Sequence, residues 1–97
     1  MFVVTVKFEL VPGAEAAFMP LMHTQAKNSL ELETECHQFD VCTDPEKPGT
    51  VFLYELYSDE AAFQLHLASD HFKQFDADVA ALVQDKQVQL YQRSYPA

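Results

Sequence analysis

The sequence predicts an α+β fold of the ferredoxin-like type, with element order strand, helix, strand, strand, helix, strand. Alternating apolar residues at 2–10 and an aromatic-rich stretch at 50–57 predict strands, and apolar residues at helical spacing predict helices over 14–33 and 59–83. Such a sheet carries helices on one face only. We therefore expect a second copy to cover the other face, which gives a homodimeric α/β barrel.

Length and charge limit the classes of function. The 97 residues suit one domain, 1–97. The net charge is −9 and the few Lys and Arg residues are scattered, so neither nucleic acid nor an anionic membrane is an expected partner. No apolar run approaches the ~20 residues of a membrane helix. The N-terminal residues MFVVTVKFEL lack the basic start of a signal peptide, so we expect a cytoplasmic protein.

The first half of the chain has clear punctuation. In residues 2–10 every second side chain is apolar, which predicts a strand with one strongly apolar face, ended by Pro12-Gly13. The helix predicted at 14–33 contains Pro20. A proline there removes a backbone hydrogen bond and clashes one turn back, so we expect a kink or a loosely formed start.

The second half begins with a predicted hairpin, whose strands at 36–43 and 50–57 flank the turn residues 44–49. The strand at 50–57 is apolar on both faces, which predicts a central place in the sheet. Ser58 is the expected cap of the next helix, and Ser69 the cap of a continuation. That segment is either one broken helix or two helices in tandem. Residues 87–93 are the predicted last strand.

The two cysteines, Cys36 and Cys42, fall in one predicted strand. Six residues of strand separate them by roughly 20 Å, too far for a disulfide. We expect free thiols in a reducing compartment. A nucleophilic Cys36 is the less favoured alternative.

Several motifs, taken in order, resemble the antibiotic biosynthesis monooxygenase family. The segment SLELETECHQFDV, from Ser29 to Val41, resembles the family's stretch between first helix and second strand. The later motifs that fit are Asp44-Pro45, LYELY at 53–57, Ser58-Asp59, AAF at 61–63, His66 and SDHF at 69–72. The family usually has Pro-Gly before the strand-two cysteine, where this chain has Thr34-Glu35.

The resemblance implies a dimeric barrel and several known activities. These are cofactor-free oxygenation of quinols and phenols, haem degradation, and isomerisation of a phosphorylated signalling sugar; the branches most similar here are the quinol monooxygenases and the autoinducer-2 processing enzymes. The haem-degrading branch carries an axial histidine where this chain has Asp76, an asparagine near Val6 and a tryptophan at His66. We therefore expect no haem.

His66 is the first candidate for catalysis. It lies on the apolar face of its predicted helix with Phe63 and Leu67, and a half-buried imidazole can move protons near neutral pH. A core histidine satisfied by one hydrogen bond is the alternative, and the resemblance favours the pocket. Tyr54 is the second candidate, as a hydrogen-bond donor to a substrate oxygen in the same cavity, with a plain core aromatic as the alternative.

His71, Glu55, Tyr57 and Val6 are candidates for substrate binding. His71 follows the break at Ser69, and the alternative interpretation is a surface or capping histidine. Five residues of regular helix place it roughly 140° from His66, which argues against a joint metal site. Glu55 and Tyr57 point to the opposite side from Tyr54. A carboxylate in so apolar a strand needs a partner or a raised pKa, and an intersubunit ion pair between Glu55 and Arg93 is the interpretation narrowly favoured over catalysis.

Two kinds of function remain. One is an enzyme without metal, haem or flavin, which binds a small quinol-like or phenolic molecule and oxygenates it, or isomerises a sugar-like signal molecule; His66 serves as acid and base in either case. The other is a non-catalytic dimer that binds a small ligand. The absence of a ligand cluster or a Gly-rich phosphate loop in the sequence supports the cofactor-free expectation.

Overall fold

Strand β1 (Phe2–Leu10) sets the two faces of the sheet. Its even-numbered residues are all buried and face the helices, because a strand turns successive side chains to opposite sides. Phe18 and Met22 of α1 (Glu15–Leu32) are fully buried in the same core cluster. Phe8 and Phe18 meet edge to face, with ring centroids 5.2 Å apart. The alternation predicted for residues 2–10 is confirmed.

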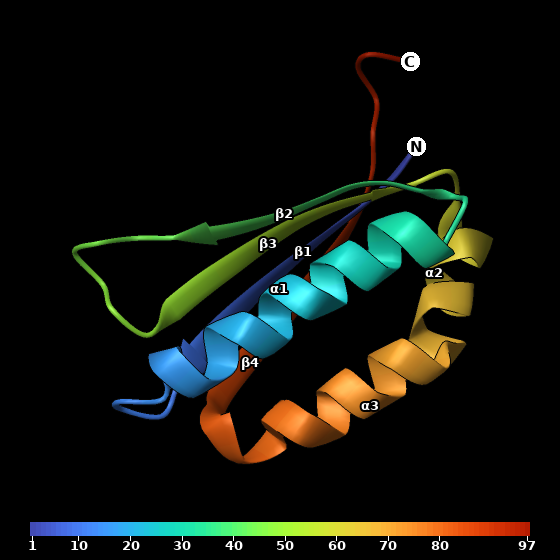
Figure 1. The fold of residues 1–97 in the computed structure, drawn as a ribbon. Coiled ribbons are helices and arrows are strands. Elements are labelled where there is room, and N and C mark those ends of the chain that lie inside the picture. Colours follow the sequence, from blue (N-terminus) through green and yellow to red (C-terminus); the bar gives the residue numbers. More distant parts are fainter.

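The structure is a computed structural model that describes all 97 residues. Strands β2 (Cys36–Thr43), β3 (Thr50–Tyr57) and β4 (Val83–Gln92) join β1 in one antiparallel sheet of order β2-β3-β1-β4. Helix α1, with α2 (Glu60–Ala68) and α3 (Asp70–Val79), lies on one face of that sheet, as Figure 1 shows. A 3-10 turn (Ala80–Leu82) leads into β4. The fold is the predicted ferredoxin-like βαββαβ arrangement, and β3 is internal as expected.

The register of β3 decides which of its side chains the helices cover. Glu55 lies opposite Val4 on β1 and Phe39 on β2, which belong to the core. Tyr54 lies opposite Thr5 and Asp40, on the face without helices. We call these the helix face and the open face.

Two local predictions need correction. The cap of α2 is Asp59, whose Oδ1 accepts from the backbone N–H of Ala62, and not Ser58. The last strand begins at Val83, earlier than predicted. Helix α1 is continuous through Pro20, and no side chain caps its start. Pro20 and Ala16, whose carbonyl loses a partner, are both exposed, so water can satisfy that carbonyl.

Other local predictions hold. Ser69 caps α3 by accepting from the N–H of Phe72, and the second helical segment is two helices in tandem. Both cysteines are free thiols, Cys36 buried and Cys42 exposed. Among the helices of the structure, none has the length and hydropathy of a membrane-spanning segment.

Candidate active site

A cavity of about 200 Å³ lies on the helix face, between β1, β4 and the helices α2 and α3. Helices leave the outer part of β4 uncovered: Val88 and Leu90 point to the helix face, yet are 47% and 50% exposed. The cavity is mostly apolar, and its lining residues are Val4, Val6, Glu55, Phe63, His66, Leu67, Phe72, Lys86, Val88 and Leu90. A smaller cavity of about 30 Å³ shares Glu55, His66 and Lys86 with it and reaches Gln25 of α1.

His66 lies at the inner face of α2 and lines both cavities. Its side chain is only 4% exposed, and its ring contacts Phe72 at 5.1 Å and Tyr57 at 5.5 Å between centroids. Nδ1 lies 2.8 Å from Oε2 of Glu33. Since a carboxylate only accepts, Nδ1 carries the proton in this bond, and Nε2 is left as the basic nitrogen of the neutral ring.

Glu33 directly follows α1 and joins two histidines. The same Oε2 lies 2.8 Å from Nε2 of His71, a close approach that lacks hydrogen-bond alignment. Nδ1 of His71 pairs with Oε1 of Gln25 at 3.1 Å. The expectation that His66 and His71 diverge by roughly 140° is wrong, because it assumed a regular helix; the break at Ser69 brings their rings to 6.0 Å.

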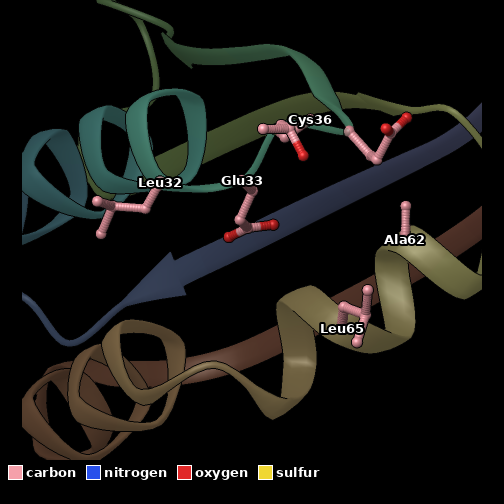
Figure 2. Close-up of a pocket in the computed structure, with 7 residues that line it drawn as sticks. Leu32, Glu33, Cys36, Ala62 and Leu65 are labelled. Carbon is pink, nitrogen blue, oxygen red and sulfur yellow. The ribbon is translucent and has the colours of Figure 1, made fainter.

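A pocket of about 200 Å³ opens at the surface where α1 ends, lined by Leu32, Glu33, Thr34, Glu35, Cys36, Ala62 and Leu65. Figure 2 shows the Glu33 carboxylate reaching into the space between the end of α1 and helix α2, which carries Ala62 and Leu65. Burial, with the negative charges of Glu33 and Glu55, raises the pKa of the Cys36 thiol to about 12. The thiol is therefore protonated near neutral pH, which argues against a nucleophilic Cys36.

Glu55 is a carboxyl group buried on the helix face. Burial raises its pKa above the ordinary value, against the hydrogen bond that Tyr57 donates to its Oε1 at 2.6 Å and the neighbouring side chains of His66 and Lys86. Burial and the Glu55 charge also raise the pKa of Tyr57, which stays a donor. Within the chain, the partner of Glu55 is Tyr57 on the helix face. An intersubunit ion pair between Glu55 and Arg93 stays a prediction.

Lys86 supplies the cavity's one cationic side chain. Its Nζ lies 5.7 Å from the ring centroid of Phe8 and 5.6 Å from that of Phe72, within the range of cation–π attraction. Asp76 forms a long ion pair with it at 3.7 Å. The ammonium is thus held over the cavity by two aromatic faces, with the exposed carboxylate of Asp76 beside it and the buried carboxyl of Glu55 in the same cavity.

Tyr54 does not share the cavity with His66, and that prediction is wrong. It occupies the open face, since its neighbours Leu53 and Glu55 point to the helices. Of the other predicted site residues, Val6 and Glu55 line the cavity with His66. Tyr57 and His71 do not line the cavity. Tyr57 donates to Glu55, and His71 lies beside Glu33, the partner of His66.

Sequence reasoning missed Glu33 and Lys86. Glu33 is separated from His66 by 33 positions and has no local motif, so only the fold brings the two together. Lys86 carried a usable signal, because it alternates with Val88 and Leu90 on one face of a strand. No group of three or more His, Cys, Asp and Glu side chains is arranged to hold a metal ion.

Several solved structures share this fold. The fold matches a crystal structure described as an antibiotic biosynthesis monooxygenase, at 26% identity and TM-score 0.87, covering 96% of this chain and 98% of the other. It also matches a protein of Mycobacterium tuberculosis (23% identity, TM-score 0.89, 99% and 97% covered) and a conserved protein of Methanosarcina mazei (23%, 0.88, 96% and 92%). No curated protein matches the chain.

A protein-family model also matches most of the chain. The family model described as antibiotic biosynthesis monooxygenase matches residues 1–78, which include β1, His66 and His71. Lys86, on β4, lies beyond the matched residues. The chain belongs to the antibiotic biosynthesis monooxygenase family.

Proposed function

We propose that this protein is a cofactor-independent monooxygenase that oxygenates a small phenol or quinol in the cavity beside His66. The observation that carries the proposal is a buried imidazole, held through Nδ1 by a carboxylate, that lines an apolar cavity containing one ammonium group. The apolar lining suits an aromatic ring. The imidazole suits removal of a phenolic proton, and the Lys86 ammonium suits the anion that remains.

The proposed reaction uses O₂ as oxidant and the substrate as reductant. Nε2 of His66 removes the O–H proton, and the phenolate oxygen lies toward Nζ of Lys86. A ring carbon of the phenolate then bonds to O₂. The peroxide anion that forms takes up one proton from water and becomes a hydroperoxide. A base then removes the hydrogen on that carbon as a proton, the C–H electron pair forms the carbonyl, and the O–O bond breaks with loss of hydroxide. The hydroxide takes up a second proton to form water, so the two protons that the substrate loses balance the two that are taken up. Phenol and O₂ thus give quinone and water.

Glu55 fits the acid in the last step. Because burial raises its pKa, it holds its proton at a higher pH than an exposed glutamate does. Tyr57 donates to Oε1, which leaves Oε2 as the atom that carries a proton. Glu55 lines both cavities beside His66, so the leaving hydroxide would form within its reach.

The shape and charge of the cavity favour a phenol over a phosphorylated sugar. A volume of about 200 Å³ is below the ~300–1,000 Å³ of typical ligand pockets, which suits one or two rings. A sugar phosphate needs many hydrogen-bonding groups. The cavity offers only Lys86, His66 and Glu55 beside seven apolar residues, which is too few polar groups for a phosphorylated sugar.

Oxygen uptake tests the proposal. Purified protein is mixed with a panel of one- and two-ring quinols and phenols, in air and under nitrogen. We expect uptake of one O₂ per quinone formed in air, and no product under nitrogen. Product under nitrogen would indicate isomerisation, and binding without turnover by the wild type would indicate a ligand-binding dimer; either outcome contradicts the proposal.

A further inference from the structure

Glu33 lies where three spaces of the molecule meet. Through His66 it reaches the apolar cavity, and its own carboxylate borders the surface pocket of Figure 2. Through His71 it reaches a polar groove of about 240 Å³ between α1 and α3. His66 does not line the surface pocket, and Glu33 does not line the cavity. The 2.8 Å bond between them therefore crosses from the substrate's side of the molecule to a solvent-accessible side.

A bound substrate would leave His66 a single polar route to water. The side chain is 4% exposed, and the ring is enclosed by aromatic side chains. Nε2 has no hydrogen-bond partner within the chain, and a phenol in the cavity would cover it. Nδ1 remains, and it is bonded to Glu33, whose side chain is 15% exposed.

We infer that Glu33 both orients His66 and passes its proton to water in the surface pocket while substrate fills the cavity. The inference rests on the proposed role of His66 as base. When Nε2 accepts the phenolic proton, the substrate O–H bond breaks and an N–H bond forms. The imidazolium then releases its Nδ1 proton to Oε2 of Glu33, from which water in the pocket takes it. The phenolate keeps its electrons, and His66 returns to neutral.

The surroundings of Glu33 suit a proton carrier. The titratable groups near it are His66 from α2, His71 from α3, Glu35 and Cys36 from the segment that begins β2, and Glu55 and Tyr57 from β3. No lysine or arginine pairs with it, so no fixed positive charge holds it permanently ionised. Glu35 lines the same pocket but bonds to Ser58 and touches neither His66 nor His71. It is therefore a matched control.

The test is designed to separate orientation from proton transfer. Glu33→Gln keeps an oxygen that can accept from Nδ1 but cannot take the proton; Glu33→Asp keeps the acid with a shorter reach; Glu35→Gln is the control. Protein labelled with ¹⁵N-histidine reports by NMR the tautomer of His66 and the rate at which its Nδ1 proton exchanges with water, with and without a phenol bound under nitrogen.

We expect wild type and Glu35→Gln to exchange alike with phenol bound. Glu33→Gln should keep the Nδ1–H tautomer and slow the exchange by about tenfold or more, and Glu33→Asp should recover part of the rate. In air, Glu33→Gln should lower kcat by about 10²-fold, with KM little changed. Unchanged exchange in Glu33→Gln, or equal slowing in Glu35→Gln, would overturn the inference.

The two proposals fail differently. If the wild type consumes no oxygen, the proposed function is wrong, yet the exchange rates still show whether Glu33 carries the proton of His66. If the wild type turns over and Glu33→Gln exchanges normally, only the relay is wrong. Thermal melting of each variant shows whether it is folded, and Glu33→Asp supplies the second measurement where Glu33→Gln is not.

Discussion

The two faces of the sheet consist of the same strands, but their side chains differ in burial and in hydrogen bonding. On β3, Glu55 and Tyr57 point to the helix face, where both are buried and bonded to each other. Tyr54, which directly precedes Glu55 in sequence, points to the open face with Phe52, which is exposed. Glu55 lines the cavity, and Tyr57 donates to its carboxyl group. Polar groups on the open face lie among exposed aromatic residues.

The difference shows that burial selects which polar residues can do chemistry. The same carboxyl group loses its proton readily in water but holds it when buried. On the helix face, burial shifts the protonation of Glu55 and confines His66 to one orientation. On the open face the exposed aromatic surface favours association instead. The experiments below test this division, beginning with the largest expected effect.

Separate substitutions of the two predicted catalytic residues, His66 and Tyr54, test the difference between the two faces directly. His66→Ala should lower turnover of a quinol by about 10²–10⁴-fold, because it removes the base, and should lower the free energy of unfolding by only ~1–2 kcal/mol. Tyr54→Phe, on the open face, should leave kcat within a factor of about two, since surface changes away from a site have small effects. Equal losses in both variants would mean that the open face also serves the reaction.

Replacement of the cavity's ammonium should weaken catalysis next most. Lys86→Met keeps the unbranched chain beside Phe8 and Phe72 but removes the charge. We expect kcat/KM to fall by about 10²-fold, the usual effect of losing one group that stabilises a developing anion. Lys7→Met, on the open face, is the control. Unchanged kinetics of Lys86→Met would show that the phenolate is stabilised elsewhere.

Association through the open face is the third expectation. We propose that two copies pair their open faces, because Phe52 and Tyr91 are exposed there and no helix covers them. Light scattering at micromolar concentration should give a dimer. Tyr91→Glu should shift it toward monomer by about 2 kcal/mol, as loss of a buried aromatic anchor does. Leu30→Glu, on the exposed side of α1, should not; a monomeric wild type would contradict the pairing.

The pH dependence of stability should change least, and only through the helix face. The pKa of Glu55 is raised above its ordinary 4.5, so above that pH the unfolded chain releases its proton first and the folded state loses stability until Glu55 itself ionises. Glu55→Gln lacks this loss. The free energy of unfolding of Glu55→Gln minus that of the wild type, both measured by urea titration, should increase from pH 4 to pH 8. A constant difference would show that burial does not hold the proton.

The sequence by itself determined the fold and half of the site. Period-two alternation in 2–10, the aromatic-rich apolar run at 50–57 and helical spacing in 14–33 are local patterns, so the elements and the helix face of β1 could be read directly. His66 and Glu55 were visible because each is a polar residue on an apolar stripe. Family motifs, which resemble those of known monooxygenases, gave the class.

Only the tertiary structure decided which residues meet. Because side chains alternate along a strand, the sequence placed Tyr54 and Glu55 on opposite faces, but it could not say which of the two faced the helices. The register of β3 against β1 settled that question. The break at Ser69 brought His71 to within reach of Glu33, which a regular helix forbids. Glu33 and Lys86 are distant in sequence from His66, and the fold brings them to the site. Their places depend on how α1 and β4 pack, and no local pattern encodes that packing.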